Sequence, residues 1–228
     1  ENAVRFGTWQ HVAVVSDGMA MKLYVNGNVV KEENTASGDM SNTDVSLLIG
    51  AGWNKDATAP FEDHMFKGAM DELRIYDTAV NDAEMKDLAA EGNPDEEIEL
   101  PESLFQFTMD EVIDGTGENV GKKVVINETD QKEYAVNGNY RVDDFGIYGK
   151  SLEFNGNNTY ITIGNPEIHD EYTFEAWVNI DPSGGNSLNK IFGRDRTTIP
   201  QDSFYFCVRN TGNIEFETKG SEAGTWLE

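Results

Sequence analysis

The sequence predicts an all-β protein: a two-layer antiparallel β-sandwich with one short helix. Three observations support this prediction. Short segments rich in Val, Ile, Tyr and Phe alternate with Gly, Asn and Asp turns along most of the 228 residues. These segments number about a dozen, more than the seven strands of an immunoglobulin-type sandwich. Only the stretch after residue 80 has helical features, and its apolar stripe is short.

The first predicted strands form hairpins. Residues 11–15 and 22–25 are joined by a Ser-Asp-Gly turn, and Asn26-Gly27 is a tight-turn sequence that leads to a strand at 29–30. Further strands are predicted at residues 46–49, 69–76, 104–107, 151–154, 160–163, 172–180, 190–192, 203–208 and 214–217.

The helix is predicted over residues 81–91. Asn81 can cap its first turn, and Glu84 can complete a capping box three residues later. Gly92 can end it. Because the apolar stripe is short, we expect the helix to lie across one end of the sandwich.

Composition limits the classes of function. There are 42 acidic and 17 basic residues, a net charge of −25, which disfavours nucleic acid and anionic membrane surfaces as partners. The acidity suits a divalent cation such as calcium, although a solvated acidic surface explains most of it equally well. The single Cys207 cannot form an internal disulfide and is expected to be a core thiol. No apolar run is long enough for membrane insertion.

A Gly-Thr-Trp motif occurs near both ends, at residues 7–9 and 224–226. Chance recurrence in a β protein is one explanation. The other is that the chain is one turn of a cycle that is cut at this motif. Residues 1–91 would then be the second half of a domain pattern and residues 103–228 the first half, joined by the acidic, proline-bracketed linker 92–102.

Several motifs carry a family resemblance. Residues 7–15 (GTWQHVAVV), 22–27 (KLYVNG) and 68–76 (GAMDELRIY) closely resemble the second half of laminin G-like domains of the concanavalin A-like lectin/glucanase superfamily. The segments that resemble the first half are 104–107 (LFQF), 149–156 (GKSLEFNG), 160–163 (YITI) and 172–178 (YTFEAWV). The resemblance implies a jelly roll related to that of pentraxins.

Compared with that family pattern, the two halves stand in reversed order. The chain either spans the junction of two tandem repeats or is a circular permutant. In both cases the full set of strands occurs once, so we expect residues 1–228 to form one closed sandwich rather than two half-domains. A reciprocal exchange of halves between chains would satisfy the same contacts and give domain-swapped self-association.

The predicted loop 53–64 is the candidate ligand site, because function in such folds is carried by loops. Trp53, the one tryptophan in a predicted loop, could stack on a sugar ring. Resemblance to pentraxins implies that this loop and a second one bind calcium, which in turn binds the ligand. The candidate residues are Trp53, Asn54, Asp56, Glu62, Asp63 and, from the second loop, Asp202. A polar loop without metal is the alternative.

The resemblance implies a second calcium position, at which a structural ion ties the first strand of the pattern to the last. Asp71 occupies the usual ligand position, and Asp110 together with oxygens of Asn155 and Gly156 could complete the cage. Alternatively, Asp71 accepts hydrogen bonds from turn amides.

Glucanases of this superfamily need two carboxylates on closely spaced, same-facing strand positions. No such arrangement is predicted here; Glu153 and Glu175 are single strand acids that we expect to face solvent. We therefore predict a non-catalytic, calcium-dependent carbohydrate-binding or adhesion module of a larger secreted or cell-surface protein. Its partner would be a glycan, a polysaccharide or a cell-surface glycoprotein. The alternatives are a structural spacer repeat of an adhesin and, with least support, a glycoside hydrolase.

Overall fold

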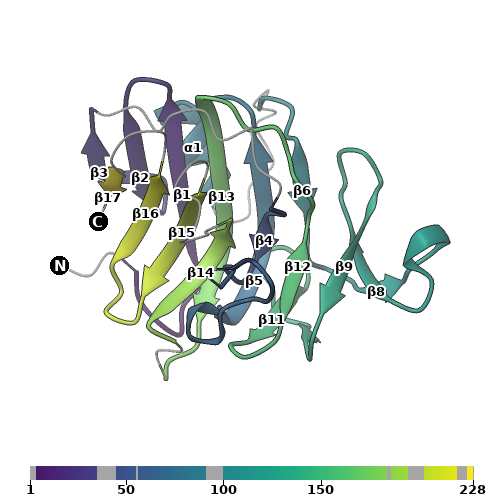
Figure 1. Cartoon of the computed structure of the whole chain (residues 1–228). Coiled ribbons are helices and arrows are strands. Elements are labelled where there is room, and N and C mark those ends of the chain that lie inside the picture. The colour runs from purple at the N-terminus through teal and green to yellow at the C-terminus, as the bar shows by residue number, and fades with distance from the viewer. Residues whose placement is uncertain are drawn as a thin grey trace.

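The computed structural model describes residues 4–34, 45–54, 56–90, 100–183, 186–194, 203–219 and 225–227. Over these residues the chain forms two antiparallel sheets stacked face to face, with one short α-helix (Figure 1). The predicted all-β sandwich is confirmed.

The first sheet has eight strands in the described part of the chain, in the order β10-β11-β5-β13-β1-β2-β3, with β6 also paired to β5. Its strands are β1 (Gln10–Asp17), β2 (Met21–Val25), β3 (Asn28–Glu33), β5 (Lys67–Tyr76), β6 (Phe105–Phe107), β10 (Arg141–Asp143), β11 (Ser151–Asn155) and β13 (Glu171–Ile180).

The second sheet has nine strands among the described residues, in the order β17-β16-β15-β14-β4-β12-β9-β8-β7. Its strands are β4 (Leu48–Ile49), β7 (Ile113–Asp114), β8 (Lys123–Ile126), β9 (Glu133–Asn137), β12 (Tyr160–Thr162), β14 (Leu188–Gly193), β15 (Ser203–Arg209), β16 (Ile214–Lys219) and β17 (Thr225–Leu227).

The main core lies between the sheets and follows from the period-2 alternation of strand side chains. On β13, Phe174, Ala176 and Val178 point into it, whereas Glu175 and Trp177 point to the outer face. Aromatic side chains pack among aliphatic ones in this core, and fully burying a Phe side chain contributes about 1.5–3 kcal/mol. The aromatic side chains of this core below 2% exposure are Phe66, Phe107, Phe154, Tyr172, Phe174, Phe192, Phe204, Phe206 and Phe216.

Both sheets mix strands from the two parts of the chain. In the first sheet, β1 is paired with β13 from Gln10↔Val178 to Asp17↔Glu171, and β5 lies between β11 and β13. In the second sheet, β4 lies between β12 and β14. Neither the first 90 residues nor the chain from residue 100 onward therefore supplies a complete sheet (Figure 1).

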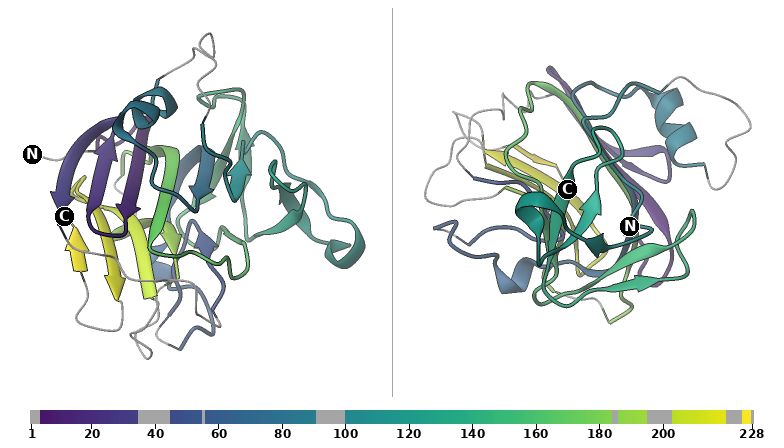
Figure 2. Two further views of the ribbon diagram at one scale, coloured as in Figure 1. Left: turned by 90° about the horizontal axis from the view of Figure 1, so that it is seen from above. Right: turned by 90° about the vertical axis from the view of Figure 1, so that its right-hand side faces the viewer.

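Four strands, β7 to β10, were not predicted from the sequence. They are short, and most of their side chains are only partly buried. Figure 2 shows why: β7, β8 and the 3-10 helix η2 (Gly117–Asn119) project beyond one end of the sandwich. Strands with so little core contact lack the apolar alternation that identifies a strand in a sequence.

The helix α1 (Asp82–Leu88) begins as predicted. The Asn81 side chain accepts hydrogen bonds from the Ala83 and Glu84 backbone N–H groups, and Glu84 completes the capping box. The expected position at a sandwich end is wrong, because Met85 and Leu88 pack on the outer face of the first sheet against Ala13 and Tyr24.

Most of the expected linker 92–102 lies outside the described residues. In the described part of the chain, no helix is long and apolar enough to cross a membrane.

Candidate functional site

An irregularity in β5 creates the first candidate site. The register between β5 and β13 shifts between Glu175 and Trp177, and Glu72 has a left-handed φ of 46°. This is a β-bulge, which redirects a side chain and leaves its residue unpaired. Strand β11 pairs with β5 up to Met70, and β6 pairs with it from Leu73 onward, so the bulge falls between the two partners.

Asp71 lies directly before this bulge and has no exposed surface. Its Oδ2 accepts hydrogen bonds from the backbone N–H groups of Ile147 (2.7 Å) and Tyr148 (3.2 Å), and its Oδ1 accepts one from the N–H of Glu72 (2.9 Å). Burial raises the pKa of Asp71 to about 6; the three N–H groups oppose this shift, and the negative charge of Asp110 adds to it.

Asp110 follows β6 and reaches the same loop. Its Oδ1 accepts a hydrogen bond from the backbone N–H of Lys150 (2.6 Å). Two glycines let the carboxylates approach the loop backbone: a Cβ at Gly146 would lie 2.5 Å from Asp71 Oδ2, and one at Gly149 would lie 2.5 Å from Asp110 Oδ1. The carboxylates of Asp71 and Asp110 are therefore both held against the backbone of the loop 146–150.

Asn155 and Gly156 are not part of this group. Asn155 pairs with Lys67, which lies about 13 Å along β5 from Asp71. Its Oδ1 accepts hydrogen bonds from the N–H groups of Asn157 (2.8 Å) and Asn158 (3.0 Å), which shapes a turn. The expectation that all four residues form one oxygen cage is not met by this geometry.

Asp71 and Asp110 could bind calcium only together with further oxygen ligands. Across the described ranges, no three His, Cys, Asp or Glu side chains are grouped closely enough to hold a metal ion. Calcium takes six to eight oxygen ligands and accepts backbone carbonyls and water among them. Asp71 and Asp110 could supply the two carboxylates of such a site.

A buried charge network, which the sequence did not indicate, lies next to this site. Glu175 is fully buried on β13, where His11 Nε2 lies 2.7 Å and Arg74 Nη1 lies 2.9 Å from its carboxylate oxygens. Burial alone would raise the pKa of Glu175, but Arg74 and His11 hold it below its usual value. The expected solvent exposure of Glu175 is wrong: its side chain has no exposed surface and pairs with Arg74 and His11 on the neighbouring strands.

The loop 53–64 forms a second candidate site. Trp53 is half-buried: its indole N–H donates to the Ser46 carbonyl (2.6 Å), and its ring packs on Leu48, Ala51 and Met65. Trp53 covers part of the outer face of the second sheet. It is not the only tryptophan outside a strand, because Trp9 precedes β1.

The other candidates of this loop divide into two groups. The Asn54 side chain is bonded within the loop, because its Oδ1 accepts a hydrogen bond from the backbone N–H of Thr58 (3.0 Å). Asp56, Glu62 and Asp63 are exposed. The exposed aromatic ring of the loop is Phe61, which is 40% accessible and contacts the His64 ring edge-on at 4.4 Å between centroids.

The chain just before β14 completes the rim of this loop. Asn186 Nδ2 donates to the carbonyls of Glu62 (3.1 Å) and Met65 (2.9 Å), and Ser187 Oγ donates to the carbonyl of Asp63 (3.2 Å). Asp202 lies outside the described residues, so its place near this rim stays a prediction.

A carboxylate pair on one face of β16 was not predicted from the sequence. Glu215 and Glu217 alternate with core residues, so both point to the outer face of the second sheet. Glu215 accepts a hydrogen bond from the Tyr205 hydroxyl (2.6 Å) and pairs with Arg209. Burial raises the pKa of Tyr205, and the two carboxylates add to the effect. Their Glu-x-Glu spacing was the available signal.

The comparisons with known proteins bear on the identity of the fold. Residues 1–86 match the laminin G-like family model described as the concanavalin A-like lectin/glucanases superfamily. This match confirms the recognised family over those residues and supports a lectin-like or adhesion module in broad terms. Domains of this type are generally non-catalytic. No curated protein and no solved structure matched the chain.

Proposed function

We propose, from the premise that residues 1–86 carry the concanavalin A-like lectin/glucanases pattern, that this protein is a non-catalytic, calcium-dependent glycan-binding or adhesion module. Its partner is a glycan, a polysaccharide or a cell-surface glycoprotein, and its location is extracellular or at the cell surface. The order of its halves reflects a circular permutation or a repeat junction, which would also permit domain-swapped association.

One observation carries the calcium part of the proposal: two carboxylates, Asp71 and Asp110, converge on the loop 146–150. Asp71 is buried, and its pKa is raised to about 6 by burial and in part by the charge of Asp110. A divalent cation between the two carboxylates would offset this repulsion and hold the loop in place.

The glycan part of the proposal rests on the exposed loop 53–64. Phe61 offers an apolar ring, and Asp56, Glu62 and Asp63 can accept hydrogen bonds from sugar hydroxyls directly or through a second calcium ion. Trp53 and Asn54 would act mainly by shaping the loop, since both side chains are bonded inside it. Asp202 is proposed to join this site.

The spacer function is the second candidate, and one observation favours it. Trp53, the ring first proposed to stack on sugar, is partly used to cover the sheet, which is what a loop without a ligand requires. A glycoside hydrolase has less support, because Glu215 of the Glu215–Glu217 pair on β16 is already bonded to Tyr205 and Arg209.

A glycan array probed with and without calcium tests the proposal. We expect retention on at least one class of glycan in millimolar calcium and its loss in chelator. Phe61→Ala should reduce retention and leave the melting temperature unchanged, because the ring is exposed. Val120→Ala is the control, as Val120 is an equally apolar exposed side chain on the projecting hairpin. No retention on any glycan with calcium present would favour the spacer.

A further inference from the structure

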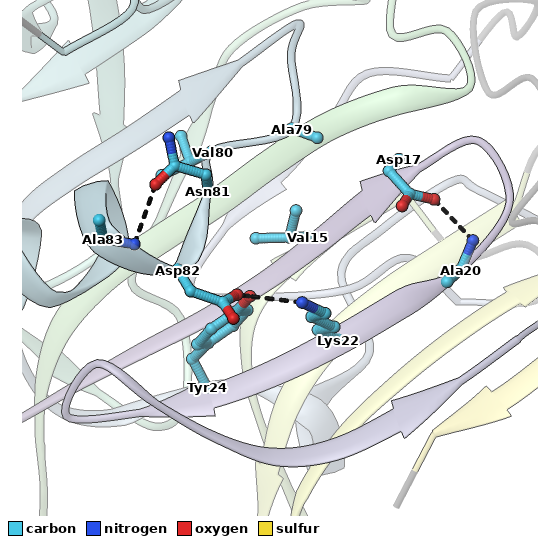
Figure 3. A pocket seen from close by; sticks show the side chains of 10 residues that line it. All are labelled: Val15, Asp17, Ala20, Lys22, Tyr24, Ala79, Val80, Asn81, Asp82 and Ala83. Carbon is cyan, nitrogen blue, oxygen red and sulfur yellow. Dashed lines mark hydrogen bonds and ion pairs between the residues drawn. The ribbon is translucent and has the colours of Figure 1, made fainter.

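A cleft opens on the outer face of the first sheet, away from Asp71 and from the loop 53–64. It lies between the β1–β2 hairpin and the segment that leads into α1, and its volume is about 530 Å³ (Figure 3). Small-ligand sites in proteins typically have volumes of roughly 300–1,000 Å³. The cleft is therefore large enough for one or two sugar rings.

The floor of the cleft is apolar and made of small side chains. Val15 projects from β1, and Ala79 and Val80 come from the chain that crosses in front of the sheet. Figure 3 shows Val15 between the two polar sides of the cleft. A floor of this kind leaves room for a flat ligand and can contact the C–H face of a ring.

One polar side of the cleft is formed by three interacting groups. Asp82 Oδ1 accepts hydrogen bonds from Lys22 Nζ (3.0 Å) and from the Tyr24 hydroxyl (2.6 Å). The hydrogen bond from Tyr24, followed by that from Lys22, lowers the pKa of Asp82 and keeps it ionised. Its Oδ2 makes no hydrogen bond within the part of the chain that the structure describes.

Asp17 forms the opposite side. Its Oδ1 accepts hydrogen bonds from the backbone N–H groups of Met19 (2.9 Å) and Ala20 (2.7 Å), which fixes the side chain at the hairpin turn. Its Oδ2 has no partner among the described residues. Each side of the cleft thus presents one free carboxylate oxygen, and Lys22 adds an ammonium donor.

This set of groups selects the chemistry of a ligand. Carboxylate oxygens only accept hydrogen bonds and the ammonium only donates them, so a ligand that satisfies both must donate and accept. Sugar hydroxyls do both. Two aspartates against one lysine leave the cleft negative, and the chain carries a net charge of −25, so an acidic ligand is repelled.

We infer that this cleft binds a neutral or amine-bearing sugar ring. The inference rests on the proposed glycan-binding function for its ligand class, and it adds a site that needs neither calcium nor the loop 53–64. Asp17 and Asp82 accept hydrogen bonds from ring substituents, Lys22 donates to a hydroxyl or ring oxygen, and Val15 and Val80 contact the ring.

Three probes that share one pyranose ring and differ in charge test the ligand class: glucosamine, glucose and glucuronate. Each is titrated into the full chain in chelator, and the backbone amide shifts are followed by NMR. We expect saturable shifts at residues 15–24 and 79–83 with glucose and glucosamine, and at least about tenfold weaker binding of glucuronate. No saturable shift in this region with any of the three sugars, or equally tight binding of glucuronate, overturns the inference.

A pair of tryptophan substitutions tests the location. Ala83 lines the cleft and Ala90 lies outside it just beyond the same helix, and both are exposed, so a larger side chain is tolerated at either position. Ala83→Trp should fill the cleft and weaken glucose binding more than tenfold, whereas Ala90→Trp should not change it. Unchanged binding by the Ala83 variant overturns the assignment of the site.

A charge substitution separates the roles of the polar groups. Lys22→Met removes the donor and keeps the aliphatic stem, so glucose binding should weaken about tenfold, as expected for one charged hydrogen bond. Glucosamine should bind at least as tightly as before, because its amine then meets two carboxylates without a competing cation. Equal weakening for both sugars contradicts the charge argument.

The outcome of these titrations does not depend on the proposed calcium-dependent function. Because they are run in chelator, a glycan array without calcium-dependent retention leaves the cleft result unaffected. Val120→Ala, on the projecting hairpin, should not change glucose binding in the cleft.

Discussion

At the scale of single residues, Asp71 combines full burial with an ionisable group at a bulge. Its pKa of about 6, above the usual 3.8, means that without a cation the folded protein binds a proton that the unfolded chain has released. The contribution of Asp71 to stability therefore increases as the pH falls from about 7 toward 4. Burial also raises the pKa of Glu72, to about 7, which acts in the same direction.

Calcium should reverse this pH dependence, because the ion binds the ionised carboxylate and must displace the proton at low pH. We expect millimolar calcium to raise the melting temperature clearly at about pH 7.5 and much less at about pH 5. Scanning calorimetry in calcium and in chelator at both pH values measures the difference. An equal calcium effect at the two pH values would show that Asp71 is not a ligand.

Arg74 is the second residue whose substitution should lower stability by a predictable amount, because it pairs with the fully buried Glu175. Arg74→Met leaves that carboxylate with His11 alone, and removing one partner of a buried pair costs about 3–5 kcal/mol. The matched control is Arg141→Met, which removes an exposed pair with Glu153 and should cost less than about 1 kcal/mol. Urea unfolding measures the free energy of unfolding of both variants. Similar losses of stability would contradict the claim that the buried Arg74–Glu175 pair stabilises the fold.

At the scale of elements, α1 depends on its first turn, since it is only seven residues long. Asn81→Ala removes two hydrogen bonds from the cap and should lower stability by about 1 kcal/mol. Asn210→Ala, at an exposed turn, is the control and should change stability by less than about 0.5 kcal/mol. Because Met85 and Leu88 pack on the sheet, loss of the cap should also expose Tyr24 to fluorescence quenching. An unchanged melt and unchanged quenching would contradict this.

The elements also show what the sequence could predict. Core strands such as β1, β13 and β15 were predictable because buried positions produce a clear alternation. The strands β7 to β10 were not, because they are short and most of their side chains are only partly buried. The capping box of α1 is a local signal and was predicted, whereas the sheet face it covers depends on tertiary packing.

The same distinction applies to the candidate sites. Asp71 and Asp110 were predicted from family resemblance, and in the structure both accept hydrogen bonds from backbone N–H groups of the loop 146–150. Asn155 was grouped with them, but the register of β11 against β5 places it at the far end of the strand pair. The Glu175 network was missed because Arg74 and His11 lie far from Glu175 in sequence, and only the register of β1, β13 and β5 brings them together.

At the scale of the whole molecule, each sheet contains strands from both parts of the chain. Fragments 1–90 and 100–228 should each be unfolded or aggregated alone, since each would expose the inner face of an incomplete sheet. Refolded together in equal amounts, they should recover the circular dichroism spectrum and a cooperative melt. A monomeric 1–90 fragment with its own cooperative melt would show that the chain contains separate units.

The proposed function depends most directly on calcium binding at Asp71 and Asp110. Isothermal titration of calcium into the chelator-treated chain at about pH 7.5 should show a site that is lost in both Asp71→Asn and Asp110→Asn. Asp114→Asn, at an exposed position on β7, should leave that site intact. If the wild-type chain binds no calcium, or if both variants bind it as tightly as the wild type, the calcium-dependent account is wrong.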